Sequence, residues 1–137
     1  VHGTLALIVL FDQLSRNMYR DSPDMYRFDP LALACTDALL EGSLHLTLHP
    51  IQRWFAYMPL MHAEDLERQD QCVQLFEGLV VDAAPAKRDA YESALDFAVR
   101  HRDIVARFGR FPHRNRILGR DSTAEEVAFL EEPGSSF

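Results

Sequence analysis

The stretch HRDIVARFGRFPHRNRIL, residues 101–118, decides the fold. It joins the end of a long amphipathic helix to a glycine break and a short second helix. Gly109 occupies the position where helices commonly end, and Pro112 is suited to start the next turn. Upstream, the predicted helix 85–108 carries a stripe with the 3.6-residue period of an α-helix, formed by Ala90, Ala94, Phe97, Ala98, His101, Ile104, Val105 and Phe108.

The rest of the chain also shows helical patterns and no strand alternation. Asp29 is expected to cap the helix that Pro30 opens, and Pro59 is expected to break or kink the helix that starts at Pro50. Residues 122–125, STAE, read as a capping box for the last helix. The predicted helices cover residues 4–19, 29–41, from 50, 64–81, 85–108, 112–118 and 122–131.

Short turns between these helices predict antiparallel neighbours. We therefore expect one all-α domain over residues 1–137, built as stacked antiparallel helical hairpins with a tetratricopeptide-like arrangement. The sequence shows no regular repeat with a period near 34 residues. The chain also starts abruptly inside an apolar helix, and we expect that an N-terminal helical segment is missing.

Charge is distributed unevenly along the chain. Residues 100–120 hold seven arginines and one aspartate, a net charge of +6, so that the remainder of a chain with net charge −7 carries −13. This acidic remainder argues against a nucleic-acid binder. Because Lys87 is the only lysine, positive charge here means guanidinium, which suits bidentate pairing with carboxylates or phosphates.

Other features bear on the compartment. Cys35 and Cys72 lie far apart in helical patterns, which predicts reduced thiols and a cytoplasmic location. No signal peptide is recognisable, and the apolar run 5–11 is too short to cross a membrane. If the missing segment normally covers the first helix, the apolar face of that helix is exposed without it, and this exposed face would favour homo-oligomers.

Three segments carry a resemblance to a known family. LALIVLFDQLSRNMYR (5–20), FAYMPLMHAEDLERQ (55–69) and HRDIVARFGRFPHRNRILGRDSTAEEVAFL (101–130) resemble, in this order, the bacterial family catalogued as domain of unknown function 924. The resemblance covers essentially the whole chain. It implies a helical, tetratricopeptide-like fold and no established activity. The chain departs from the family at 14–15, where a Phe-Pro pair is common.

The arginine block supports two interpretations. At the turn, Arg110, His113 and Arg114 are interpreted as a pocket for a carboxylate or phosphate, because exposed N–H groups at a helix start add to an anion site. The predicted ligand-binding residues are Trp54, Tyr57, His62, Arg110, His113 and Arg114. Within the helices, charges are interpreted as a structural ion-pair network because buried charges need partners. That network comprises Asp12, Arg16, Glu64, Asp65, Arg102 and Arg107.

The preferred function is a binding or interaction module for an anionic small molecule or an acidic peptide or protein. The alternative is a small enzyme that acts on an anionic substrate through His62, His113 and the pair Glu64 and Asp65. A metal held by those residues with His101 is the weaker version, because no metal-ligand spacing supports it. We predict no metal and no cofactor.

Overall fold

The computed structural model describes residues 1–136, and all its regular elements are helices. This confirms the all-α prediction. The elements are α1 (His2–Ile8), η1 (Val9–Leu14), α2 (Ser15–Met18), η2 (Pro23–Tyr26), α3 (Asp29–Glu41), η3 (Leu44–Thr47), α4 (Pro50–Met61), α5 (Leu66–Asp82), η4 (Pro85–Lys87), α6 (Arg88–Phe108), η5 (Pro112–Arg114), α7 (Asn115–Leu118) and α8 (Ala124–Leu130). No helix among residues 1–136 is both long and apolar enough to cross a membrane.

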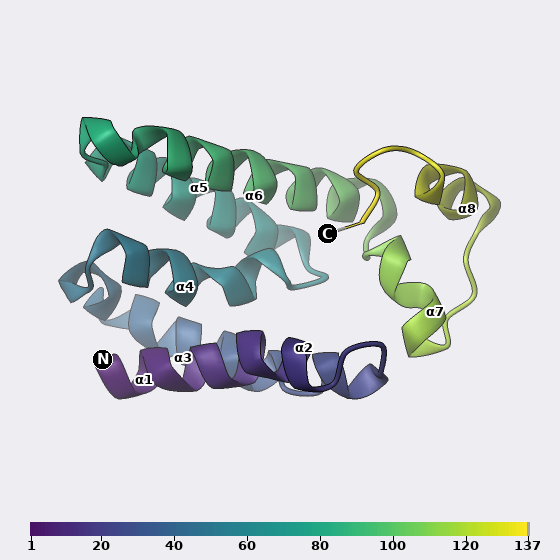
Figure 1. Cartoon of the computed structure of the whole chain (residues 1–137), viewed down its shortest axis with the longest axis horizontal. Coiled ribbons are helices and arrows are strands. Elements are labelled where there is room, and N and C mark those ends of the chain that lie inside the picture. The colour runs from purple at the N-terminus through teal and green to yellow at the C-terminus, as the bar shows by residue number, and fades with distance from the viewer. Residues whose placement is uncertain (137) are drawn as a thin grey trace.

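The N-terminal rod runs through α1, η1 and α2 as one continuous helix (Figure 1). Its middle third, η1, is a π-helix, which is rare and often marks a functional site. Ile8 and Asp12 are buried on the inner side of the rod. A carboxylate is therefore held at the edge of an otherwise apolar core.

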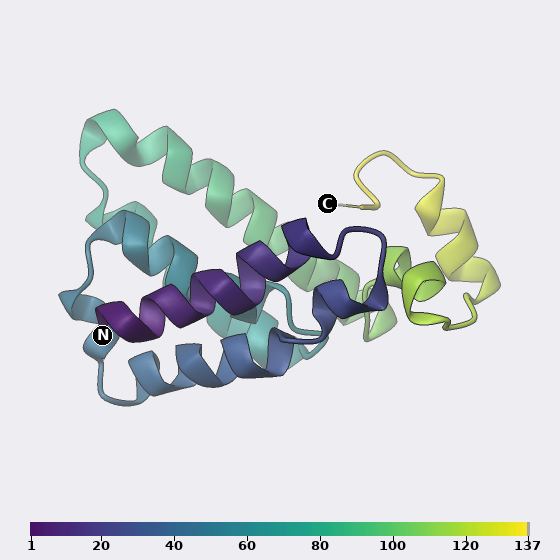
Figure 2. The same ribbon diagram turned by 60° about the horizontal axis from the view of Figure 1, so that its bottom comes forward.

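The long helices form a stack in chain order (Figures 1 and 2). α5 and α6 make the most extensive contact, α4 packs on α5, and α3 packs on both α4 and α1. The main core lies between them and includes Leu39, Tyr57, Leu60, Phe76 and Ala98. Short connections make sequential neighbours pack together, as the sequence predicts.

Several helix ends differ from their predicted positions. Phe28, not Asp29, is the N-cap of α3. α4 continues through Pro59 to Met61, although a proline within a helix removes one internal hydrogen bond. The capping box of α8 uses Thr123 with Glu126, one residue later than predicted.

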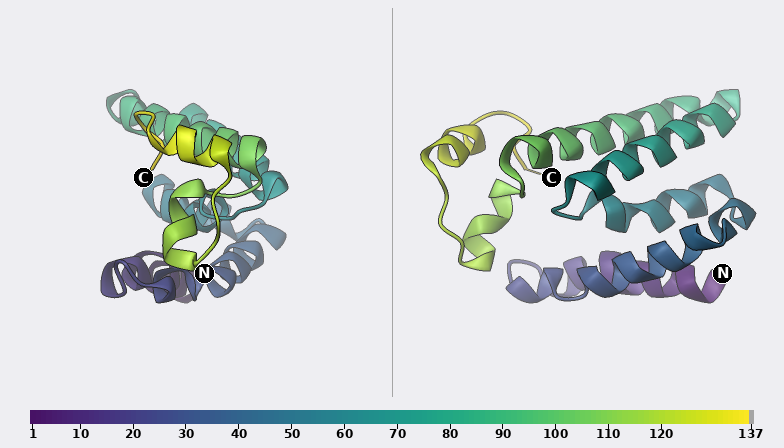
Figure 3. Two further views of the ribbon diagram at one scale, coloured as in Figure 1. Left: turned by 90° about the vertical axis from the view of Figure 1, so that its right-hand side faces the viewer. Right: turned by 180° about the vertical axis from the view of Figure 1, so that it is seen from behind.

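The C-terminal elements η5, α7 and α8 form a small block at one end of the stack (Figure 3). Gly109 ends α6 with a φ of +70°, as the sequence predicts. Ile104, Phe111 and Phe129 form a second apolar cluster there. This block brings Arg114 of η5 beside Tyr26 of η2.

Candidate functional site

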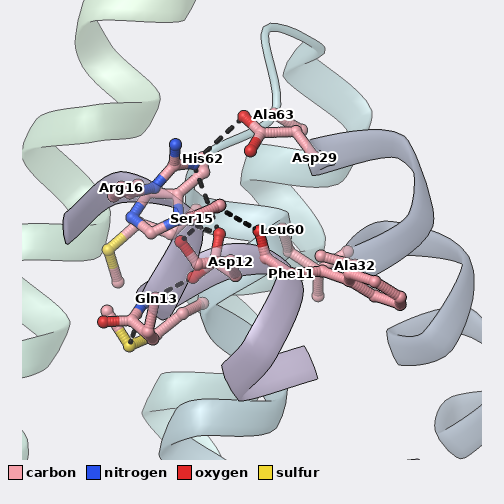
Figure 4. A network of polar contacts seen from close by, with 12 residues as sticks. Phe11, Asp12, Gln13, Ser15, Arg16, Asp29, Ala32, Leu60, His62 and Ala63 are labelled. Atoms are coloured by element: carbon pink, nitrogen blue, oxygen red, sulfur yellow. Dashed lines mark hydrogen bonds and ion pairs between the residues drawn. The ribbon is translucent and has the colours of Figure 1, made fainter. Parts of the chain in front are cut away.

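A buried Asp and a half-buried His form a pair where the N-terminal rod meets the end of α4 (Figure 4). The Nδ1 atom of His62, the C-cap of α4, lies 2.6 Å from Oδ1 of Asp12. Because an ionised carboxylate only accepts hydrogen bonds, Nδ1 carries the proton. Burial alone would raise the pKa of Asp12, but His62, Arg16 and the amide of Gln13 together hold that pKa below its usual value.

Arg16 connects this pair to the start of α3 (Figure 4). Its Nη2 donates to Asp12 at 3.3 Å and to Asp29 at 3.0 Å, and its Nη1 donates to the carbonyl of Met25 at 3.3 Å. Burial raises the pKa of Asp29, although Arg16 opposes this effect. Within residues 1–136, Oδ1 of Asp29 has no hydrogen-bond partner. Arg16 therefore makes three hydrogen bonds, whereas one carboxylate oxygen of Asp29 accepts none from residues 1–136.

Arg114 reaches the same region from η5, and its side chain is 8% exposed. The guanidinium carbon lies 4.6 Å from the ring centre of Tyr26 and 4.5 Å from that of Phe111. Its Nη1 is 3.8 Å from Asp29, beyond hydrogen-bonding distance, and its Nε has no hydrogen-bond partner among residues 1–136. Buried charged groups are normally hydrogen-bonded, so the Nε of Arg114 is an exception to that rule.

These groups surround a cavity of about 220 Å³, called here the polar cavity. It is lined by Gln13, Arg16, Met25, Tyr26, Met58, His62, His101, His113 and Arg114. Burial lowers the pKa of His113 to about 4 and that of His101 to about 3, so both imidazoles are neutral at pH 7. The Nδ1 of His101 lies 2.7 Å from the carbonyl of Phe97 and donates to it.

A second cavity of about 360 Å³ adjoins the polar cavity and is called here the apolar cavity. Both cavities share Met58, His62 and His101 as lining residues. The remaining wall is mainly apolar and comes from α4 and α6. It consists of Trp54, Met61, Ser93, Ala94 and Phe97. Phe97, predicted to lie on the buried stripe of the long helix, is in fact 46% exposed and lies at the cavity wall.

The structure brings together only some of the predicted ligand-binding residues. His62, His113 and Arg114 line the polar cavity, and Trp54 lines the apolar one. Tyr57 lies in the core, where its hydroxyl is 2.6 Å from Nδ1 of His45.

Arg110 lies outside both cavities. Its Nε and Nη2 make a bidentate pair with the Glu126 carboxylate at 2.6 and 2.8 Å, and Nη2 also donates to the carbonyl of Asp121. These bonds use the donors that we predicted would bind a ligand.

Several residues of the predicted ion-pair network have other partners in the structure than the ones expected. Asp12 and Arg16 pair with each other, but Glu64 accepts two hydrogen bonds from Arg120 and one from the backbone N–H of Phe111. Asp65 instead caps α5 by accepting from the backbone N–H of Arg68.

The helix-borne arginines of that network also have other partners than predicted. Arg102 binds Asp70 and Arg107 binds Glu125, each at 2.9 Å. Neither arginine therefore reaches the acidic residues of the predicted network.

Sequence reasoning missed Tyr26 and Met58, which line the polar cavity, and Asp29, whose Oδ1 has no hydrogen-bond partner within residues 1–136. Asp29 has the signature of a helix cap, which hid its role as a partner of two arginines. Among residues 1–136, the structure gathers no group of three or more His, Cys, Asp or Glu side chains that could hold a metal ion. Glu64 and Asp65 are bonded elsewhere, as described.

Comparisons with known proteins agree with this fold. A solved structure described as a protein of unknown function from Agrobacterium tumefaciens is 40% identical, with a TM-score of 0.80. The match covers 93% of this chain and 66% of that one, so this chain spans slightly less than two thirds of its relative's length. No curated protein matches the chain. Residues 1–134 match the family described as "Bacterial protein of unknown function (DUF924)", and the chain therefore belongs to that bacterial family.

Proposed function

We propose that this protein binds an anionic ligand, with a carboxylate or phosphate group, in the polar cavity. The observation that carries the proposal is Arg114, a buried guanidinium at the cavity wall whose Nε has no hydrogen-bond partner among residues 1–136. An unsatisfied buried donor of this kind costs about 1–3 kcal/mol. An anion that comes within hydrogen-bonding distance of this Nε would satisfy it.

The size of the cavity favours a small molecule over an acidic protein. Small-molecule sites usually occupy about 300–1,000 Å³, and the polar cavity, at about 220 Å³, accommodates only the charged part of a ligand. His113 is neutral at pH 7 and adds no charge of its own. The two guanidinium groups of Arg16 and Arg114 are then the cations that attract the ligand.

The test is isothermal titration of the protein with acetate and with inorganic phosphate, alongside Arg114→Met. Arg107→Met is the matched control, since Arg107 lies on the surface and pairs with Glu125. The proposal requires that at least one anion binds the wild type and the control but not Arg114→Met. Equal binding by all three proteins, or binding by none, would reject it.

The distance of 2.6 Å between Asp12 and His62 favours a second candidate, general acid–base chemistry on the bound anion. A carboxylate that fixes the proton on Nδ1 leaves Nε2 to act as the base. This version replaces the predicted acidic partners Glu64 and Asp65 with Asp12.

Its test is the rate of hydrolysis of p-nitrophenyl phosphate, an anion, in which water attacks the phosphorus atom and releases inorganic phosphate and p-nitrophenol. His62→Gln should reduce the rate by at least about 100-fold, the lower end of what general bases contribute. A rate in the wild type no faster than in this variant would eliminate the enzymatic candidate.

A further inference from the structure

The apolar cavity has no role in binding a simple anion, yet it shares a wall with the polar cavity. Met58, His62 and His101 line both. The apolar cavity, at about 360 Å³, lies within the usual size range of small-molecule sites. A molecule with a charged head in one cavity could therefore extend an apolar body into the other.

The charges near the polar cavity limit the charge of that head. Arg16 and Arg114 face two carboxylates, Asp12 and Asp29, at distances of 3.0–3.8 Å. A ligand with two negative charges would be repelled by both carboxylates, whereas a single charge spread over a planar group meets less opposition. A guanidinium matches the geometry of carboxylates and of phosphates, so it is the charge of the head group that separates the two.

The walls of the apolar cavity limit the chemical nature of the ligand's apolar body. Trp54, Met61, Ala94 and Phe97 offer aromatic and aliphatic contacts, and the flexible thioether of Met58 stands at the junction. Ser93 is the only hydroxyl among these lining residues, and it lies on the exposed side of α6. An unbranched acyl chain or an aromatic ring suits this surface, and a sugar or a peptide backbone does not.

We infer that the ligand is an amphiphilic monocarboxylate, with its carboxylate against Arg114 in the polar cavity and its apolar body along α4 and α6 in the apolar cavity. This inference rests on the proposed function, because it assumes that the polar cavity receives the charged group. It adds the class of the ligand and a second subsite lined by Trp54 and Phe97.

The experiment compares acetate and octanoate by isothermal titration, with octanol and octyl phosphate as probes of the head group. Each methylene buried in an apolar site improves affinity by about fourfold. Burial of three methylenes would therefore make octanoate about 60-fold tighter than acetate. Octanoate should also bind at least about tenfold more tightly than octanol or octyl phosphate, because of the charge arguments above.

Two substitutions on α6 separate the subsites. Ser93→Trp should fill the apolar cavity and remove the advantage of octanoate while acetate binding stays unchanged. Ala106→Trp is the matched control, which adds the same bulk at an exposed position of α6 outside both cavities and should retain that advantage.

The outcomes distinguish the two proposals. If acetate and octanoate bind with equal affinity, and Arg114→Met abolishes both, the amphiphile is rejected and anion binding stands. If octanol or octyl phosphate binds as tightly as octanoate, the assignment to a monocarboxylate is rejected. If no anion binds at all, the proposed function fails and the inference fails with it.

Discussion

Two arginines that line the same cavity should differ sharply in what they contribute to stability. We compare Arg16→Met with Arg114→Met, since methionine keeps much of the apolar stem while it removes the charge. Arg16 donates to Asp12, Asp29 and the carbonyl of Met25. Within residues 1–136, the guanidinium of Arg114 makes no hydrogen bond, and its Nη1 lies 3.8 Å from the Asp29 carboxylate.

The magnitudes follow from these contacts. Removing one partner of a buried, hydrogen-bonded ion pair costs about 3–5 kcal/mol, which is the loss expected for Arg16→Met. Arg114→Met loses two cation–π contacts, with Tyr26 and Phe111, of about 2 kcal/mol each at a desolvated site. It also removes an unsatisfied buried donor that costs about 1–3 kcal/mol, so the net loss should be about 1–3 kcal/mol.

Urea unfolding at pH 7, followed by circular dichroism, measures both changes in the free energy of unfolding. The same samples give the titrations with acetate and octanoate, so that stability and binding are read on one preparation. The reasoning is refuted if Arg114→Met loses as much stability as Arg16→Met, because Arg114 would then be a structural residue. A protein that tolerates loss of Arg114 but no longer binds anions would identify the arginine retained for a ligand.

Three further outcomes test the description. The pKa of Asp12 is lowered in the folded state, so the stability that its ionised form contributes is present above the unfolded pKa and is lost as the pH falls. The difference in unfolding free energy between wild type and Asp12→Asn should therefore shrink below about pH 4. A constant difference in urea titrations down to about pH 3 would contradict this. Thr123→Ala should cost about 1 kcal/mol in thermal unfolding by removing the α8 cap, whereas Ser122→Ala, at the predicted cap, should cost less. Cys72 is fully buried and burial raises its pKa, so it should react with a thiol reagent only after unfolding; rapid labelling of native protein would show that the core opens there.

Local patterns predicted the elements well. The stripe along the long helix places Ala94, Ala98, Ile104 and Val105 in the core, and the break at Gly109 lies where predicted. These features depend on neighbours within one or two helical turns, which a sequence displays directly. The π-helix escaped prediction because residues 5–11 are apolar nearly all round and define no register.

The site could be predicted only in part because its contacts join distant segments. Asp12 and His62 are 50 residues apart, and Glu64 and Arg120 are 56 apart. Composition shows that arginines and carboxylates are present but not which will meet. Arg110 and Arg114 are four residues apart in one turn, yet one is saturated by Glu126 and the other lines the cavity. Only the folded structure distinguishes the surroundings of these two arginines.

The placement of the polar cavity has a consequence for how the molecule holds together. Its wall takes side chains from residues 13–26 at one end of the chain and from residues 113–114 near the other. A molecule bound there would contact both the N-terminal rod and the C-terminal block and would stabilise their packing against each other. Amide hydrogens in both regions should then slow their exchange together, while those of the outer turns of α5 remain as they were.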